Sequence, residues 1–143
     1  IVRELTVEDC FAGPEEDPID KPIEGYYYMG PCSGEQIADL FNSCDLFCMP
    51  SYFEAYGLVF IEALSFGLPC IGRNCYEMPY FIEEGVTGEL ITDDDINVLA
   101  SKIQKILEDD SYAKNVARKR DWYLEEYSWD MVANRILNVI KSA

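Results

Sequence analysis

The sequence predicts an α/β fold in which helices flank a parallel sheet. Short apolar runs that resemble buried strands recur at residues 46–49, 70–72 and 88–91. Segments with apolar residues at helical spacing separate these runs, and Gly and Pro residues mark the boundaries. Continuous apolar strands that alternate with helices are typical of parallel sheets that are covered on both faces.

The chain as a whole divides into three predicted parts. Residues 1–24 are expected to form an irregular entry segment, in which residues 1–7 end a helix or form a strand and residues 8–24, rich in Pro, Asp and Glu, form a surface loop. Residues 26–92 are expected to form the strand and helix core, and residues 94–141 the C-terminal helices. Because 143 residues suit one domain with a sizeable core, we interpret the chain as a single partial domain.

Turn and cap residues set the predicted boundaries within these parts. Ser33 is placed to cap the first helix, and Gly67 ends the second. Asp94 or a neighbour begins the first C-terminal helix, and Ser128 begins the last one, where Trp129 is expected in the core. The predicted strands are 26–29, 46–49, 70–72 and 88–91, and the predicted helices include 34–42, 58–66, 78–84, 96–107, 112–126 and 129–140.

The charge and composition exclude several classes of function. The net charge of −16 argues against binding to the phosphate backbone of nucleic acids, which needs a basic face. The chain contains no histidine, so it lacks the commonest general acid–base residue, and no metal site is predicted. No apolar run approaches the ~18 residues that span a bilayer, and no signal peptide is visible. We therefore interpret the six cysteines as reduced residues, mostly in the core, of a cytoplasmic protein.

The most informative segment is residues 50–69, in which Glu54 and Glu62 are the only charged residues. A carboxylate among so many apolar side chains needs water or a partner, because an isolated buried charge is very costly. Three environments are open to Glu62: a ligand cleft, a solvent-exposed rim, or an ion pair with Arg73.

The predicted helix that follows Gly57 offers an anion site. Open α/β sheets bind ligands at the carboxyl ends of their strands, and Gly57 lets a ligand approach the backbone closely. The free amides of Leu58 and Val59 and the helix dipole would favour negative charge there. Glu54 precedes these amides, and Glu62 lies roughly 7–8 Å along the helix at 1.5 Å per residue. Carboxylates accept hydrogen bonds only, so the pair would suit sugar hydroxyls on either side of a phosphate.

Further motifs accompany the two glutamates, which bracket seven residues. Residues 38–51 form a helix-then-strand lead-in, 62–69 read Glu-Ala-Leu-Ser-Phe-Gly-Leu-Pro, 84–90 read Glu-Gly-Val-Thr-Gly-Glu-Leu, and 127–130 read Tyr-Ser-Trp-Asp. Together, over about residues 26–141, they resemble the retaining GT-B glycosyltransferases, a family that includes sucrose synthases, bacterial glycogen synthases and many polysaccharide and lipid-sugar transferases. The resemblance implies a Rossmann-like parallel sheet with flanking helices, the C-terminal, donor-binding half of a GT-B fold.

The resemblance also implies roles for individual residues. Glu62 would bind the ribose hydroxyls of a nucleotide-sugar donor, and Glu54 would approach the donor sugar. Backbone amides around Gly57 would hold the diphosphate, and Gly30 would lie near the base. The implied donor-binding residues are Gly30, Glu54, Tyr56, Gly57, Leu58, Val59 and Glu62.

The chain departs from the family in its basic residues. The family has an Arg and Lys pair near the start of this domain, which stabilises charge on the leaving nucleoside diphosphate. Arg3 and Lys21 are the only basic residues in this region, and their surroundings do not match that motif. We therefore expect the catalytic cations upstream of Ile1. The chain would be an excised part that lacks the acceptor-binding N-terminal domain and is inactive by itself.

These observations lead to one main hypothesis and two alternatives. The main hypothesis is retaining transfer of a sugar from a nucleotide diphosphate to a saccharide or lipid-linked acceptor, without a cofactor. A sugar-nucleotide epimerase of the same fold is disfavoured because the chain has no histidine. A receiver-like signalling domain would need a Lys after the last strand, where Thr92 and aspartates stand instead. A small basic patch, residues 114–120, could contact an anionic membrane surface in the full-length protein.

Overall fold

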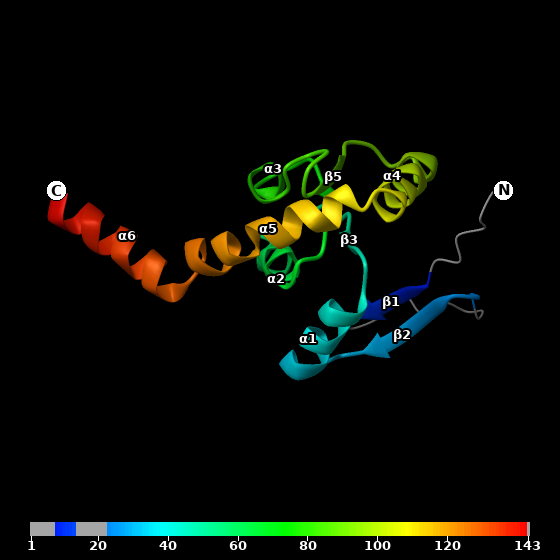
Figure 1. Ribbon diagram of the computed structural model, residues 1–143, viewed down its shortest axis with the longest axis horizontal. Helices are drawn as coiled ribbons and strands as arrows, with labels where there is room; N and C mark the ends of the chain where they lie inside the picture. The colour runs from blue at the N-terminus through cyan, green and yellow to red at the C-terminus, as the bar shows by residue number, and fades with distance from the viewer. Residues whose placement is uncertain (1–7, 14–22, 143) are drawn as a thin grey trace. The chain divides into compact units, whose positions relative to one another are not determined.

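The structure, a computed structural model, describes residues 8–13 and 23–142 (Figure 1). The chain divides into two compact units, residues 1–40 and 41–143. The predicted element within residues 1–7, and both Arg3 and Lys21, lie outside the described residues. The elements are β1 (Asp9–Ala12), β2 (Tyr26–Gly30), α1 (Gly34–Ser43), β3 (Phe47–Met49), α2 (Leu58–Phe66), β4 (Cys70–Arg73), α3 (Met78–Phe81), β5 (Gly88–Ile91), α4 (Ile96–Glu108), α5 (Ser111–Glu126) and α6 (Trp129–Ser142).

The first unit contains a parallel pair of strands, β1 and β2. The amide of Asp9 donates to the Gly25 carbonyl at 2.7 Å, and the ring of Phe11 stacks on Tyr28 with centroids 5.9 Å apart. Strand β1 corrects the prediction that residues 8–24 form only a loop. The prediction missed it because pairing with β2 stabilises this strand, and no local pattern in a segment rich in Pro and acidic residues shows that pairing.

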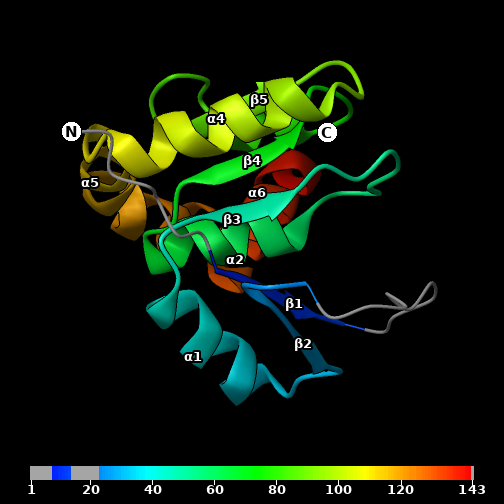
Figure 2. The same ribbon diagram turned by 90° about the vertical axis from the view of Figure 1, so that its right-hand side faces the viewer.

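The second unit is built on a three-stranded parallel sheet in the order β3-β4-β5. Helix α4 covers one face and α2 the other (Figure 2). On the α4 side, Ile71 and Ile91 of the sheet pack with Ile106 and Tyr112. On the α2 side, the ring of Phe47 lies 5.2 Å from that of Phe60. This arrangement confirms the predicted parallel sheet with flanking helices.

The helix ends follow the predicted signals. Ser33 Oγ accepts from the Gln36 amide at 3.3 Å, and Asp95, a neighbour of Asp94, caps α4 by accepting from the Asn97 amide at 2.8 Å. Ser128 Oγ likewise accepts from the Met131 amide at 3.2 Å, and Gly67 closes α2 with a left-handed φ of +96°. The structure therefore confirms four predicted helix-end residues: Ser33, Gly67, Asp95 and Ser128.

Helix α3 ends at Phe81, earlier than the predicted residue 84. The backbone becomes extended at Ile82, and the amide of Glu83 donates to Thr87 Oγ1 at 2.9 Å instead of to a helical carbonyl. A side-chain acceptor from the next turn therefore replaces the last turn of the predicted helix.

Two predictions about the core are wrong. Trp129 is 87% exposed, and α6, which lies beyond the end of α5 in Figure 1, buries none of its side chains among the described residues. Of the six free cysteines, Cys70 is buried, whereas Cys10 and Cys48 are exposed. Cys48 lies on β3, at one edge of the described three-stranded sheet, and Cys10 lies on β1 of the described two-stranded sheet.

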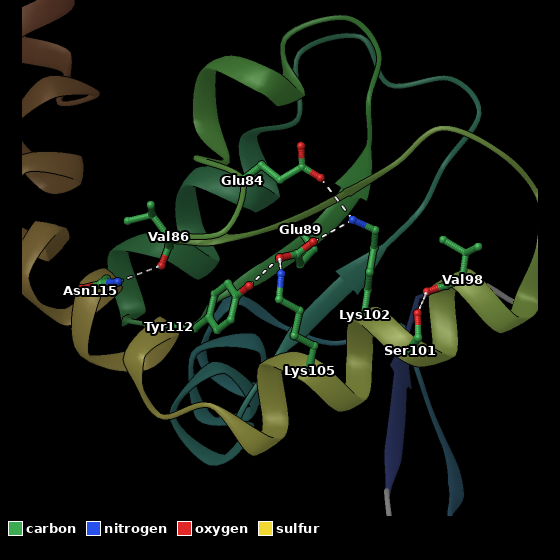
Figure 3. A network of polar contacts seen from close by, with 9 residues as sticks. All are labelled: Glu84, Val86, Glu89, Val98, Ser101, Lys102, Lys105, Tyr112 and Asn115. Carbon is green, nitrogen blue, oxygen red and sulfur yellow. Dashed lines mark hydrogen bonds and ion pairs between the residues drawn. The ribbon is translucent and has the colours of Figure 1, made fainter.

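A buried polar network holds α4 and α5 against β5 (Figure 3). The side chain of Glu89 is 3% exposed and accepts from Lys102 Nζ at 2.7 Å and Lys105 Nζ at 2.6 Å. The hydroxyl of Tyr112 donates to the same carboxylate. Burial alone would raise the pKa of Glu89, but the hydrogen bonds from Lys102, Lys105 and Tyr112 outweigh it and lower the pKa to about 2. The carboxylate therefore stays ionised and paired inside the fold.

Candidate functional site

The candidate site lies at the start of α2. Residues 50–57 connect the carboxyl end of β3 to this helix, at the edge where open α/β sheets bind ligands. Gly57 has a φ of +82°, and a Cβ built there would lie 2.3 Å from Met78 Cε. Two features of the structure therefore require glycine at this position: the left-handed backbone and the lack of space for a side chain.

Backbone groups at this helix start favour an anion. Leu58 and Val59 are the first residues of α2, so their amides have no acceptor within the helix. The Gly57 amide donates to Glu54 Oε1 at 3.1 Å, which places a carboxylate at the positive end of the helix dipole. Four of the predicted donor-binding residues therefore meet at one point. That this point binds a diphosphate stays a prediction.

Glu62 is exposed on a helix whose other side chains are largely buried. The buried residues of α2 are Phe60, Ile61, Ala63 and Leu64. In the part of the chain that the structure describes, the Glu62 carboxylate has no hydrogen bond or ion pair, and Arg73 binds a different acid. Both oxygens of Glu62 are therefore available to accept hydrogen bonds from water or a ligand.

Arg73, the last residue of β4, contacts residues that follow the other two strands of the sheet. Its Nη2 lies 2.8 Å from Asp94 Oδ1, after β5, and its Nε donates to the carbonyl of Pro50, after β3, at 3.4 Å. The guanidinium carbon lies 4.2 Å from the centroid of the Tyr52 ring. Hydrogen bonds with Tyr52 and Arg73 lower the pKa of Asp94. Arg73 therefore ties the loop that carries Glu54 to the ends of β4 and β5.

Aromatic side chains from two loops surround this edge of the sheet. Tyr56, one of the predicted donor-binding residues, packs edge-to-face against Phe81 with ring centroids 5.3 Å apart. Phe53 makes the same type of contact with Tyr76 at 5.7 Å. Tyr76 has a φ of +50°, the only positive φ of a non-glycine residue in the described ranges, which costs about 1–3 kcal/mol and is typical of functional loops.

Gly30, the remaining predicted donor-binding residue, belongs to the other compact unit. It ends β2 with a φ of +68°, and its carbonyl accepts from the Gly13 amide at 3.0 Å. Its proposed place near the base of a nucleotide stays a prediction.

The acidic run Asp93–Asp95 is a helix start. Asp95 caps α4, Asp93 Oδ1 accepts from the Asp95 amide at 3.3 Å, and Asp94 is paired with Arg73. Among residues 8–13 and 23–142, no group of three or more acidic or cysteine side chains is arranged to hold a metal ion. No helix in these ranges has the length and apolar character needed to cross a membrane.

The basic patch at residues 114–120 is largely engaged in local contacts. Lys119 pairs with Glu83, Lys114 Nζ lies 3.6 Å from Asp110 Oδ2, and Arg118 Nη1 donates to Asn115 at 3.4 Å. Contact of this patch with a membrane stays a prediction.

Sequence reasoning considered Arg73 only as a possible partner of Glu62, and it did not identify Tyr52, Phe53 or Tyr76 as parts of this edge. One signal was available, because Arg73 is the only basic residue between positions 22 and 101 and it ends a predicted strand. The aromatic residues carry no such signal, since exposed and buried aromatic side chains look alike in a sequence.

Comparisons with known proteins match this chain over most of its length. The model of the family described as glycosyl transferases group 1 matches residues 20–122. Sulfoquinovosyl transferase SQD2 of Arabidopsis thaliana is 29% identical over 92% of this chain and 27% of its own length. The D-inositol 3-phosphate glycosyltransferase of Streptomyces avermitilis is 30% identical over 81% of this chain and 25% of its own length. This chain therefore spans about a quarter of the length of these relatives.

Solved structures show the same fold. The sucrose-phosphate synthase of Thermosynechococcus elongatus superposes with a TM-score of 0.73 and 27% identity, over 83% of this chain and 30% of the synthase chain. Anabaena HepE, in complex with UDP and glucose, superposes with a TM-score of 0.71 and 23% identity, over 84% of this chain and 33% of HepE. At that lower identity HepE confirms the α/β fold alone.

Proposed function

The chain belongs to the group 1 glycosyltransferases, and we propose that the start of α2 binds the nucleotide-sugar donor of such an enzyme. The observation that carries this proposal is the hydrogen bond from the Gly57 amide to the Glu54 carboxylate at the amino end of α2, on a helix whose exposed Glu62 has no partner among the described residues. The match to a transferase family disfavours both the epimerase and the receiver-like alternatives.

Each donor group has a partner in this proposal. The diphosphate lies against the amides of Leu58 and Val59, where the helix dipole favours negative charge. Glu62 accepts hydrogen bonds from the ribose hydroxyls. An incoming diphosphate competes with the Glu54 carboxylate for the Gly57 amide, which frees Glu54 to accept a hydroxyl of the donor sugar.

The proposed reaction is a retaining sugar transfer. The bond between the anomeric carbon and the diphosphate breaks, and the diphosphate leaves with the electron pair. A hydroxyl oxygen of a saccharide or lipid-linked acceptor bonds to that carbon with the same configuration, and its proton passes to the leaving diphosphate. No cofactor is part of the proposal. The cations that stabilise the leaving diphosphate, and the acceptor-binding domain, would come from a part of the full-length protein outside this chain, so the chain alone is proposed to be inactive. A cytoplasmic location, with peripheral membrane contact in the full-length protein, belongs to the same proposal.

A titration followed by nuclear magnetic resonance tests donor binding. We expect UDP, GDP or ADP to shift the backbone amide signals of Gly57, Leu58 and Val59. The Glu62→Ala variant should bind the same nucleotide about 10–100-fold more weakly, because it loses charge-assisted hydrogen bonds. Glu125→Ala is the matched control, since Glu125 is also an exposed glutamate on a helix. Equal affinity of the two variants, or no shifts at the start of α2 with any nucleotide, would contradict the proposal.

A further inference from the structure

The side chain of Arg73 is only 14% exposed and makes three contacts at the carboxyl edge of the β3-β4-β5 sheet. Its Nε donates to the Pro50 carbonyl at 3.4 Å, and its guanidinium carbon lies 4.2 Å from the centroid of the Tyr52 ring. Its Nη2 lies 2.8 Å from Asp94 Oδ1, beyond the end of β5. Two of these contacts are therefore with the first half of the loop 50–57, and the third ties the guanidinium to the segment that follows β5.

The second half of the same loop is fixed by Glu54. The Gly57 amide donates to Glu54 Oε1 at 3.1 Å, so this carboxylate is held against the start of α2. In the proposed donor complex the diphosphate takes that amide, and the bond that held Glu54 is broken. The contacts of Arg73 with Pro50 and Tyr52 do not involve the amide, so they persist. Arg73 therefore still anchors the loop two residues before Glu54 when the donor is bound.

Arginine suits this restraint because its guanidinium presents several donors in one rigid plane. Two different nitrogens bond to Pro50 and Asp94, while the flat face of the same group packs on Tyr52. A lysine offers a single ammonium nitrogen and no planar face. The neighbouring contact between the rings of Phe53 and Tyr76 is a weaker restraint, because these side chains are 74% and 55% exposed.

We propose that Arg73 is a positioning residue that keeps Glu54 within reach of the donor sugar after the diphosphate has taken the Gly57 amide. A loop without this anchor would have to be ordered when the sugar binds, and ordering each backbone residue costs conformational entropy. The nucleotide part of the donor meets the amides of α2 and Glu62, which are not among the described contacts of Arg73. Arg73 therefore favours binding of a nucleotide sugar over the free nucleotide. This assignment rests on the proposed donor function.

The test compares the affinities of the 143-residue chain for a nucleotide and for its sugar ester. Titration calorimetry is run with UDP and UDP-glucose, with ADP and ADP-glucose, and with GDP and GDP-mannose. We expect Arg73→Met to weaken binding of the sugar ester about tenfold and to leave binding of the matching nucleotide within about twofold. Arg73→Lys keeps the charge but should still weaken the sugar ester about threefold, because one nitrogen cannot replace the whole guanidinium.

A second measurement, by nuclear magnetic resonance, needs no ligand. Arg73→Met should move the backbone amide signal of Gly57 toward its position in Glu54→Ala, because a loosened loop weakens the hydrogen bond between these two residues. Arg135→Met is the matched control, since Arg135 also pairs with a carboxylate, that of Glu126, and donates to the Glu126 carbonyl at 3.2 Å. This control should move neither the Gly57 signal nor any affinity.

The outcomes separate this inference from the donor proposal. If Arg73→Met weakens nucleotide and sugar ester equally, or weakens neither, nucleotide binding is upheld and the inference is overturned. An unmoved Gly57 signal in Arg73→Met overturns the inference as well. If none of these compounds binds the wild-type chain, the donor proposal is overturned, and the Gly57 signal by itself decides whether Arg73 positions Glu54. Should Arg73→Met fail to fold, the same comparisons are decided with Arg73→Lys.

Discussion

Glu89 and Glu62 are both glutamates on elements that are otherwise mostly buried, but their surroundings are opposite. Glu89 points from β5 into a closed network in which Lys102, Lys105 and Tyr112 saturate its carboxylate (Figure 3). Glu62 is exposed on α2, and no described side chain pairs with it. Both solutions avoid an isolated buried charge, one by pairing and the other by exposure.

This difference separates a carboxylate that supports the fold from one that is available to a ligand. The hydrogen bonds of Glu89 are already used inside the protein, so its removal should cost stability and leave binding intact. The acceptors of Glu62 are unused, so its removal should cost binding and leave stability intact. The contrast is therefore measurable: a variant of Glu89 should lose stability but not binding, and a variant of Glu62 should lose binding but not stability.

The largest effect is expected for Glu89→Gln. The neutral amide leaves Lys105 without its counter-charge and leaves Lys102 only the exposed Glu84. We expect a loss of about 3 kcal/mol in the free energy of unfolding, at the low end for buried pairs because Lys105 can turn toward water. Urea unfolding followed by circular dichroism measures it. Glu84→Gln is the control, since Glu84 is an exposed partner of Lys102 and its loss should cost less than about 1 kcal/mol. Equal costs would show that burial of Glu89 adds nothing.

The same pair should respond to pH in a defined direction. The pKa of Glu89 falls from its ordinary 4.5 to about 2 on folding, so its contribution is present above pH 5 and is lost as the pH falls toward 2. At about 1.4 kcal/mol per pKa unit, the advantage of the wild type over Glu89→Gln should shrink by roughly 3 kcal/mol between these limits. Urea unfolding of both proteins at a series of pH values checks this. A constant difference would mean that the carboxylate is not preferentially ionised in the fold.

Gly57→Ala should affect both fold and binding, unlike either glutamate. The alanine must adopt a left-handed conformation and displace Met78, so we expect a cost of about 2 kcal/mol together with loss of nucleotide binding. Gly85→Ala is the control: Gly85 has a φ of +76° but open space around it, so its cost should be about 1 kcal/mol, and nucleotide binding should persist. Urea unfolding and a UDP titration measure the two effects. A Gly57→Ala variant that binds UDP normally would remove the helix start from the site.

The smallest effect on stability is expected for Glu62→Gln. Exposed side chains without contacts contribute within about 0.5 kcal/mol, so the variant should unfold like the wild type without ligand. Adding UDP at about 100 times the wild-type dissociation constant should stabilise the wild type by about 2.7 kcal/mol and the variant by clearly less. A variant that UDP stabilises as much as the wild type would leave Glu62 without a role in binding.

Local patterns in the sequence predicted the second unit well. Apolar runs identified β3, β4 and β5 to within a residue, and side-chain caps at Ser33, Asp95 and Ser128 lie where helix-start signals placed them. These features depend on residues within four positions of one another, so the chain itself contains the information. The predicted family is confirmed as well, because the Glu54 to Pro69 motif is a contiguous run.

Long-range contacts were not predictable in the same way. Strand β1 depends on pairing with β2. The sequence left Glu62 open as a partner of Arg73, but the partner in the structure is Asp94, 21 residues away. Trp129 shares the spacing of a core residue, yet it is exposed because no described element covers α6. Periodicity shows which side chains lie on one face of a helix, but not whether another element packs there.

The sequence by itself determined the order of strands and helices from β2 to α6, the family, and the contiguous segment that carries Glu54, Gly57 and Glu62. The tertiary structure decided which glutamate is buried and paired and which is exposed, and it brought Arg73 into contact with Tyr52 and Asp94. The physical reason is that helix and strand propensities act between near neighbours, whereas burial and charge pairing depend on residues that only the folded chain brings together.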